Sequence, residues 1–573
     1  MRQSEPVRLL AWVDYASPQA LLSALAEVRT FVVDGTASIA FHCDGEPDLL
    51  DAPRRLEEAR KRARIDSAEL VTCLDARAAH APSFDGLLWL DGALPAAHAA
   101  LCRQLALPHV SNRYEVEELC IERGLVPRVL ERAFCTKPWW HLHIEADGVA
   151  MPCCNAYVEA KTPSLADHPL PEVYNSQAMR RVRLSMLRGV RDPLCRDCWD
   201  REDRGECSAR STLEPARFAE AVTAARSITT AEGAIPAEKI APDDIDIRWS
   251  NLCNFKCRMC WHRSSSAWFD DAEKIAEEID ATSGPAPLRP EDSARRYLVW
   301  GERPVVSFNS DGRALDKLAP YLKSVRHVYS VGGEPLMMDE HFEFLEHLRP
   351  RASEITLAYD TNLSKLAHRG RNIFEIWRPF AKVHLGLSVD GIGPVGEYVR
   401  TGFKTERWIE NLHRIREEAQ KNSRMSYGIK TTVSSYNLFH IPDFLREALA
   451  KGYIGSPGQI AIQIIRVPTH ASPLALPKAL RERAVELYQR LARDLRGDLR
   501  GDLRGDLRSG DPAAAKLIED NIISPLRAAE DALFEIHRTT VWTDMQRLDR
   551  LRGTSWRDVA PHMGCFEPGG AAA

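Results

Sequence analysis

Three cysteines near the middle of the chain stand close enough to share one metal centre. Cys253, Cys257 and Cys260 form a Cys-x3-Cys-x2-Cys pattern. Three thiolates at this spacing can bind three irons of a cubic iron–sulfur cluster, which leaves the fourth iron without a protein ligand. Such an open iron can bind a substrate or a cofactor, whereas a fully ligated cluster mainly transfers electrons. The alternative is a zinc knuckle that takes His262 as its fourth ligand.

Further residues suited to ligand binding follow in order along the chain. Gly332-Gly333-Glu334-Pro335 comes directly after an expected strand at 328–331. Glycine lets the backbone approach a ligand closely, and Glu334 can accept a hydrogen bond from an ammonium group. Four polar residues stand at the ends of later expected strands: Asn362, Ser388, Asp390 and Thr432. Strand ends are where an α/β barrel exposes its chemistry.

This ordered series resembles the radical S-adenosylmethionine (SAM) superfamily. Its members chelate the open iron of a 4Fe-4S cluster with the amino and carboxylate groups of SAM. One electron from the reduced cluster then yields methionine and a 5′-deoxyadenosyl radical, which abstracts hydrogen from a substrate. The resemblance implies that Cys253, Cys257 and Cys260 hold this cluster. It also implies that SAM is bound by Gly332, Gly333, Glu334, Pro335, Asn362, Ser388, Asp390 and Thr432.

A second group of cysteines lies upstream of the first: Cys135, Cys153, Cys154, Cys195 and Cys198. Between the first two of them, Asp147-Gly148 predicts a hairpin turn. The pattern resembles the SPASM/twitch auxiliary-cluster domain, in the subgroup whose twitch domain lies N-terminal to the radical SAM core. The resemblance implies one auxiliary 4Fe-4S cluster, ligated by Cys135, Cys153, Cys195 and Cys198, with Cys154 as the alternative to Cys153. A zinc ribbon made from the same residues is the competing interpretation.

Four large side chains follow Cys135 closely: Trp139, Trp140, His141 and His143. Their alternation indicates a strand with two faces. Such a strand beside the cysteines could contribute either to a substrate site or to the packing of the cluster. We interpret the four side chains as packing against the auxiliary cluster.

The segments around the downstream motifs alternate regularly between strand and helix. Ile245, Ile247 and Trp249 have the period of two that is typical of a strand, and they lead into the first cysteine motif. Later strands are expected at 325–331, 355–359, 383–389, 429–433 and 459–465, separated by helices such as 341–348 and 406–418. This pattern predicts an α/β fold whose core is a partial (β/α) barrel.

We divide the chain into four parts. Residues 1–130 alternate strands, expected at 32–33, 39–41, 69–72 and 87–90, with helices, expected at 16–29 and 52–64. They form an α/β domain that resembles half of a nucleotide-sugar glycosyltransferase. The auxiliary domain is expected at 133–211, the radical SAM core at 243–470 and a helical C-terminal region at 471–573, where 548–561 extends the resemblance. The Asp-Leu-Arg-Gly repeat at 494–508 is expected to be a solvated linker.

Composition narrows the class of protein. The chain has 573 residues, 44% of them hydrophobic, and a net charge of −5. This charge does not favour nucleic acid as a partner. No apolar stretch has the length of a membrane span, and the N-terminus lacks the features of a signal peptide. We therefore expect a cytoplasmic protein that binds no membrane, and whose thiols stay reduced and free for metal.

The resemblance implies an enzyme that acts as an oxidoreductase, an epimerase or a bond-forming enzyme. A single auxiliary cluster and the glycosyltransferase-like first domain favour hydrogen abstraction from a small sugar, polyol or nucleotide-linked substrate. The alternative is a maturase that acts on a ribosomally made peptide. A further alternative is a non-catalytic zinc or iron–sulfur scaffold. The resemblance also implies a reductant such as flavodoxin or ferredoxin as a partner.

Overall fold

The computed structural model describes five strands within the first 110 residues and then 133–156, 163–203, 208–210, 215–283, 304–309, 311–497 and 511–569. The N-terminal strands form one parallel sheet in the order β3-β2-β1-β4-β5. They are β1 (Val7–Val13), β2 (Ala37–Cys43), β3 (Ala68–Leu70), β4 (Gly86–Leu88) and β5 (His109–Val110). The strands predicted at 39–41, 69–72 and 87–90 are confirmed, β1 and β5 are additional, and the strand predicted at 32–33 lies outside the described residues. The predicted helices at 16–29 and 52–64 lie outside the described residues.

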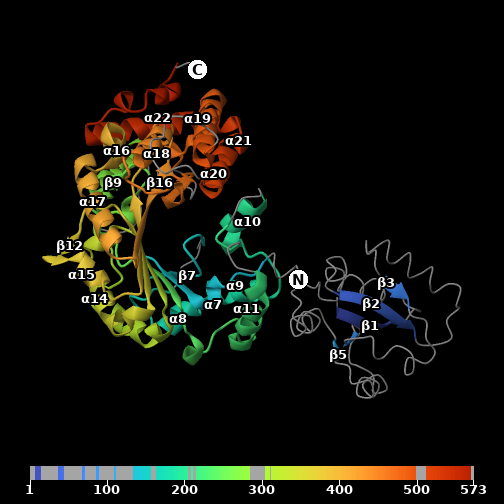
Figure 1. Ribbon diagram of the computed structural model, residues 1–573. Coiled ribbons are helices and arrows are strands. Elements are labelled where there is room, and N and C mark those ends of the chain that lie inside the picture. Colours follow the sequence, from blue (N-terminus) through green and yellow to red (C-terminus); the bar gives the residue numbers. More distant parts are fainter. Residues whose placement is uncertain are drawn as a thin grey trace.

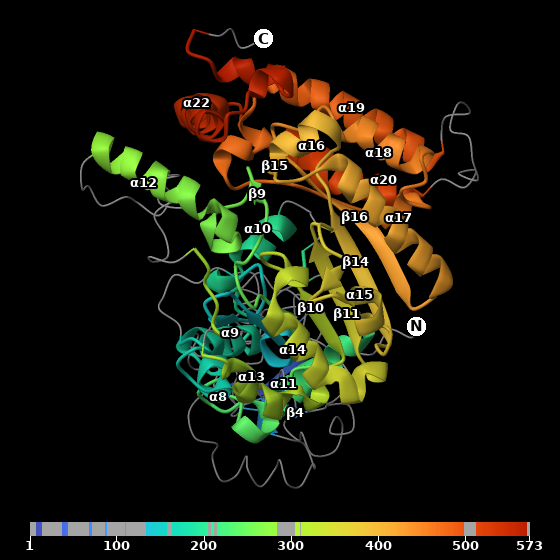
Figure 2. The ribbon, with the colours of Figure 1, turned by 90° about the vertical axis from the view of Figure 1, so that its left-hand side faces the viewer.

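A second sheet of eight strands positions the motifs. Its order is β17-β16-β14-β11-β10-β8-β6-β7, and all neighbours are parallel except the antiparallel pair β6–β7. The strands are β6 (His141–Ile144), β7 (Ala150–Met151), β8 (Asp244–Ile247), β10 (His327–Ser330), β11 (Thr356–Thr361), β14 (Lys382–Ser388), β16 (Met425–Val433) and β17 (Ile460–Ile464). Figure 2 shows β10, β11, β14 and β16 side by side. The predicted α/β fold with a partial barrel core is confirmed.

Helices cover the outer face of this sheet because each strand and helix has one apolar side. Along β11 every second residue is buried, namely Leu357, Tyr359 and Thr361. Figure 1 shows α14, α15 and α17 together on this side. The covering helices include α14 (Asp339–Leu348), α15 (Ile373–Trp377), α17 (Thr405–Lys421) and α18 (Ile441–Ala450). In α17, Trp408 and Leu412 are spaced by one helical turn and both are buried.

The hairpin of the upstream cysteine region is part of the same sheet. Strand β6 lies parallel to β8, with His141 opposite Asp244 and His143 opposite Asp246. Asp147-Gly148 makes the predicted turn between β6 and β7, with Gly148 at a φ of +80°. Of the four large side chains expected on one strand, only His141 and His143 lie in β6, because Trp139 and Trp140 belong to the short helix α7 (Lys137–Trp140). Pairing with β8 brings its carboxylates onto the face of the two histidines.

The C-terminal region packs four helices at one end of the sheet (Figure 1). They are α19 (Lys478–Arg496), α20 (Pro512–Ile518), α21 (Ser524–Ala528) and α22 (Ala532–Arg552), with a π-helical turn η13 (Glu519–Ile523) between α20 and α21. The expected linker at 494–508 begins later than predicted. Its first residues end α19, because Leu495 is buried and Asp494 accepts a 2.8 Å hydrogen bond from Arg446. Residues 498–510 lie outside the described residues.

Short elements complete the surroundings of the motifs. They are α7 (Lys137–Trp140), η2 (Pro193–Cys195), α10 (Arg196–Asp203), β9 (Lys256–Cys257), α12 (Phe269–Ser283), η8 (Pro335–Met337), β15 (Arg400–Thr401) and η15 (Pro561–Phe566). Among the helices that the structure describes, none combines the length and the apolar character needed to cross a membrane.

Candidate functional site

The loop that carries the Cys-x3-Cys-x2-Cys motif leaves the end of β8 and is held by backbone contacts. The N–H of Glu334 donates to the carbonyl of Leu252 at 2.7 Å. Strand β9, inside the motif, pairs with β15, so that Cys257 lies opposite Arg400. The segments after β10 and after β14 therefore both fix the cysteine loop.

The three thiols of this loop lie near one another and are half-buried. Burial raises the pKa of Cys257 to about 12, and the neighbouring Cys260 adds to the rise. Burial also raises the pKa of Cys253, again with help from Cys257. Thiols in such a place stay neutral unless a cation compensates the charge of the thiolates, and a bound metal centre supplies that compensation.

The spacing of the cysteines distinguishes a cluster from a single zinc ion. Tetrahedral zinc holds each sulfur at about 2.3 Å, so the sulfurs lie about 3.8 Å apart. Within the described part of the chain, the only three metal-binding atoms that all lie within 4.8 Å belong to His141, His143 and Asp246. Neither cysteine set is that compact, and the Nε2 atom of His262 lies 3.3 Å from the carbonyl of Pro304. The donor sets therefore fit iron–sulfur clusters better than zinc.

The glycine segment after β10 packs tightly against the cysteine loop, as its sequence predicts. Gly332 and Gly333 have φ angles of +78° and +54°, which favour glycine. A Cβ atom on Gly333 would lie 2.3 Å from the carbonyl oxygen of Leu252. A Cβ atom on Gly332 would lie 2.7 Å from the side chain of Arg248. Larger residues would therefore push Glu334 away from the loop.

Glu334 is buried and its carboxylate is held by three donors. One oxygen accepts from the backbone N–H of Asn362 at 2.6 Å. The other accepts from the Thr361 hydroxyl at 2.7 Å and from the Leu336 N–H at 3.2 Å. Burial raises the pKa of Glu334 to about 7. These bonds aim the carboxylate at the space beside the cysteine loop and link the end of β10 to the end of β11.

Asp390 and Asn362, both predicted from the sequence, are linked to the cysteine loop by contacts between protein side chains. Asp390 accepts from Arg400 at 2.6 Å and from the backbone N–H of Thr432 at 2.7 Å. The guanidinium of Arg400 in turn lies 3.9 Å from the sulfur of Cys257. The side-chain amide of Asn362 lies 3.9 Å from the sulfur of Cys253. Asp390 thus holds the positive charge of Arg400 beside Cys257. Both carboxylate oxygens of Asp390 accept a hydrogen bond.

The remaining residues predicted to contact SAM lie around this centre. Ser388 and Thr432 stand half-buried at or near the ends of the neighbouring strands β14 and β16. Pro335 begins η8 and is buried behind Glu334. The structure therefore places the predicted residues at the ends of the adjacent strands β10, β11, β14 and β16. Glu334, Asn362 and, through Arg400, Asp390 are linked to the cysteine loop.

Two residues outside the predicted set hold the cysteine loop from its other side. Arg258, within the motif, is fully buried and makes an ion pair with Asp549 of α22. It also donates to Thr554 at 2.6 Å and lies 3.6 Å over the ring of Tyr398. The only sequence signal for this contact was the resemblance near 548–561.

The upstream cysteines come from three segments of the chain and meet in one place. Cys135 precedes α7, Cys153 follows β7, Cys195 ends η2 and Cys198 lies in α10. Burial raises the pKa of Cys195, and Cys153, Cys135 and Cys198 each add to the rise. Burial raises the pKa of Cys153 to about 12, with smaller contributions from Cys154 and Cys135. These four thiols thus surround a common space.

Cys154 faces a different part of the molecule. Its side chain is exposed, and the charges that act on it most strongly belong to Asp246 and Arg248 of the β8 segment. The orientation of the two neighbouring cysteines therefore favours Cys153 over Cys154 as the fourth member of the upstream set.

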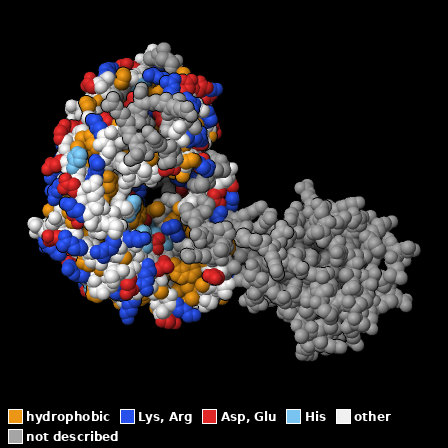
Figure 3. All heavy atoms as spheres, in the orientation of Figure 1, with side chains coloured by type: hydrophobic (Ala, Val, Ile, Leu, Met, Phe, Trp, Pro, Cys, Tyr) orange, Lys and Arg blue, Asp and Glu red, His pale blue; other side chains and the backbone are white. Residues whose placement is uncertain are grey.

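The inner face of the sheet carries charged and hydroxyl groups from the strands β10, β11 and β16. Tyr329 of β10 donates to Asp360 of β11 at 2.5 Å, and Lys430 of β16 donates to Tyr329 at 3.0 Å. Lys430 also makes an ion pair with Asp360. Figure 3 shows a hollow on this side of the molecule. Beside Lys430 lies a pocket of about 270 Å³, which is also lined by Gln463 of β17 and Arg201 of α10.

Comparison with known families agrees with this geometry. A family model for the radical SAM superfamily matches residues 247–435, and a model for the SPASM iron–sulfur cluster-binding domain matches residues 135–199. No curated protein matches the sequence. The chain thus contains a radical SAM domain, which binds a 4Fe-4S cluster and SAM, and a domain that binds auxiliary iron–sulfur. The predicted cofactors are confirmed at this level.

Several solved structures are similar over part of the chain. Native anSMEcpe with bound AdoMet and Cp18Cys peptide is 16% identical, with 44% of this chain and 60% of that chain covered and a TM-score of 0.25. Streptococcus suis SuiB bound to S-adenosylmethionine is 14% identical, with 50% and 55% covered and a TM-score of 0.27. SuiB bound to precursor peptide SuiA is 13% identical, with 63% and 82% covered and a TM-score of 0.25. The chain thus spans less than two thirds of the first two structures.

Proposed function

We propose that this radical SAM enzyme cleaves SAM to a 5′-deoxyadenosyl radical and abstracts hydrogen from a small sugar, polyol or nucleotide-linked substrate. The observation that carries the substrate class is the charged inner face formed by Tyr329, Asp360 and Lys430. An ammonium, a carboxylate and a phenol at one place suit a substrate with several hydroxyl or phosphate groups. The adjoining pocket of about 270 Å³ is close to the lower end of the range for small-molecule sites.

We assign the metal ligands from the two cysteine sets. Cys253, Cys257 and Cys260 hold the site-open cluster, and the resident cluster with SAM supplies the radical. The auxiliary cluster is held by Cys135, Cys153, Cys195 and Cys198. Arg400 places its positive charge against Cys257 and stabilises the thiolate form of that ligand. Electrons for the centre come from a reductant such as flavodoxin or ferredoxin.

Glu334 orients the cofactor by accepting an N–H from its amino group. Replacement by Gln removes the negative charge. It also puts an NH2 group where one carboxylate oxygen accepts a hydrogen bond from Thr361 or Asn362. A charge-assisted hydrogen bond contributes about 1.5–3 kcal/mol, so we expect Glu334→Gln to weaken SAM binding about ten- to a hundredfold. Calorimetric titration of cluster-loaded protein with SAM measures this effect. Glu346→Gln, on the exposed surface of α14, should bind like the parent. Equal affinities for both variants would remove Glu334 from the cofactor site.

The substrate class is tested with anaerobically reconstituted protein, dithionite and SAM. Candidate sugars, polyols and nucleotide sugars are supplied with deuterium on carbon, and deuterium in 5′-deoxyadenosine is measured by mass spectrometry. We expect transfer from one of these classes. Lys430→Met should retain the slow cleavage of SAM without substrate but lose the transfer, and Lys404→Met, at an exposed ion pair, should retain both. Transfer only from a peptide encoded beside the gene would overturn the small-substrate proposal and favour a peptide maturase.

A further inference from the structure

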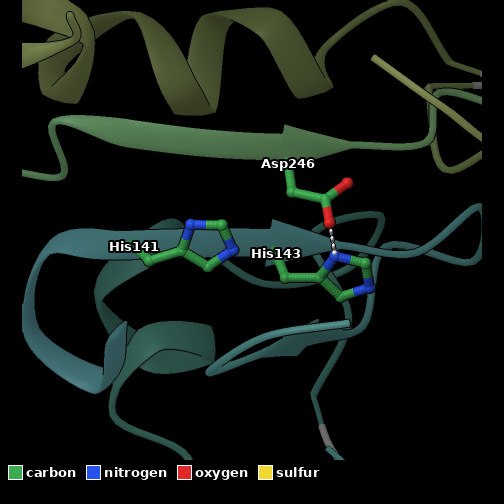
Figure 4. A group of neighbouring side chains, drawn as sticks. All are labelled: His141, His143 and Asp246. Carbon is green, nitrogen blue, oxygen red and sulfur yellow. Dashed lines mark ion pairs between the residues drawn. The ribbon is translucent and has the colours of Figure 1, made fainter. Parts of the chain in front are cut away.

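A compact polar cluster joins the auxiliary hairpin to the first strand of the barrel, apart from both cysteine sets. His141 and His143 project from one face of β6, and Asp246 projects toward them from β8 (Figure 4). The exposed fractions of these three residues are 5%, 0% and 1%. One ligand atom from each lies within 4.8 Å of the other two. Three buried groups with lone pairs are thus directed at one small volume.

Each histidine already uses one ring nitrogen and leaves the other without a hydrogen-bond partner. The Nδ1 atom of His141 is 2.6 Å from Asp244, and its buried Nε2 atom has no partner. The Nε2 atom of His143 is 3.2 Å from Glu145, and its Nδ1 atom makes no hydrogen bond. One oxygen of Asp246 is also unpartnered. Buried polar atoms are rarely left unpaired. His141 Nε2 and one oxygen of Asp246 therefore indicate a missing partner, while His143 Nδ1 faces only the other oxygen of Asp246.

The groups behind the histidines match the surroundings of metal-bound imidazoles. A histidine that binds a metal almost always shares its second ring nitrogen with a carboxylate or carbonyl, which fixes the ring. Asp244 fills that role for His141 and is itself held by His327 at 2.7 Å. Glu145 fills it for His143 and is held by Arg248 at 2.7 Å. Both rings are therefore oriented before any ion binds.

The distances also suit a single ion. The Nδ1 atom of His143 lies 2.8 Å from an oxygen of Asp246, without hydrogen-bond geometry. An ion about 2.1 Å from each ligand would separate them by about 3.0–3.4 Å, so a small opening of this pair admits it. Imidazole and carboxylate donors without sulfur suit zinc, ferrous iron or cobalt, and three protein ligands leave a position open for water or substrate oxygen.

We propose that His141, His143 and Asp246 bind one divalent transition-metal ion, in addition to the iron–sulfur clusters. The ion links β6 to β8 and so joins the auxiliary domain to the barrel. Neither set of cysteines takes part, because no cysteine sulfur belongs to the compact group.

Full-length protein with both clusters loaded is the sample for the test, with Zn²⁺ as the probe. Zinc is added anaerobically, loosely bound metal is removed, and iron and zinc are counted by mass spectrometry. We expect one zinc per chain above the iron of the clusters. His141→Gln and Asp246→Asn should each weaken zinc binding at least tenfold, while His168→Gln, at an exposed histidine of the same domain, should leave it unchanged. Unchanged binding in His141→Gln would overturn the proposal.

X-ray absorption at the zinc edge of the unmutated protein keeps the test independent of variant folding. The proposed ligands predict nitrogen and oxygen neighbours, with the outer scattering of imidazole. Sulfur neighbours at about 2.3 Å would show that zinc occupies cysteines, and would contradict the assignment. Failure to retain any zinc would also contradict the assignment. The cluster would then be an ion-pair network in which a protonated His143 lies between Asp246 and Glu145. Iron content and SAM cleavage, measured on the same samples, report separately on the proposed enzyme activity.

Discussion

Cys257→Ala is expected to abolish the production of 5′-deoxyadenosine. In the proposed assignment the site-open cluster has only three protein ligands, so removing one leaves two, and a cluster held by two thiolates is readily lost. Cys257 is also the ligand that Arg400 faces at 3.9 Å. We therefore expect the variant to lose about four irons per chain while the auxiliary cluster remains. Iron and sulfide analysis, together with chromatography of the SAM cleavage products, measures both effects.

Cys154→Ser is the matched control for this experiment. Cys154 is exposed and faces Asp246 and Arg248 rather than the other upstream cysteines. It should therefore keep the iron content and the deoxyadenosine yield of the parent. Loss of iron in Cys154→Ser would make Cys154 the auxiliary ligand in place of Cys153. Normal deoxyadenosine production by Cys257→Ala would remove this cysteine from the radical centre.

Asp549→Ala is expected to lower the free energy of unfolding by about 3–5 kcal/mol. The substitution leaves the guanidinium of Arg258 buried without its counter-charge. Asp549 also accepts hydrogen bonds from the Thr554 hydroxyl at 2.9 Å and from the Trp556 backbone N–H at 2.8 Å. All of these partners lie at the junction of α22 with the cysteine loop. The variant should therefore lose cluster stability together with fold stability.

Urea unfolding of cluster-loaded protein, followed by circular dichroism and by cluster absorbance, measures this loss. Asp443→Ala removes a carboxylate that is 83% exposed and pairs with Arg446 on the surface of α18, so it should change stability by less than about 1 kcal/mol. Arg258→Met combined with Asp549→Ala should recover part of the stability, because no buried charge then remains unpaired. If Asp549→Ala unfolds at the same urea concentration as Asp443→Ala, the buried pair is not a stabilising contact.

The sequence by itself determined the order of the chemical groups and the strands that carry them. Cys253, Cys257 and Cys260 are local in the chain, so their spacing alone limits the centre they can form. The same holds for Gly332 and Gly333. Because glycine has no Cβ atom, these residues can pack closely against the segment that carries the cysteine motif. Strands such as β11 and β16 can be predicted from the sequence because side chains along a strand alternate between its two faces with a period of two.

Tertiary structure decided which groups face one another across these elements. Cys153 and Cys154 are equivalent in sequence, and only the direction of the chain after β7 turns one toward the other cysteines and the other toward Asp246. Arg258 and Asp549 are 291 residues apart, so no local pattern reveals their pairing.

The carboxylates beside the histidines of β6 escaped the sequence analysis for the same reason. An alternating pattern shows that His141 and His143 share a face, but not which strand lies beside them. The pairing of β6 with β8 brings Asp244 and Asp246 onto that face. A periodic sequence therefore fixes the orientation of a side chain on its own element, whereas its partners depend on which distant segment packs against that element.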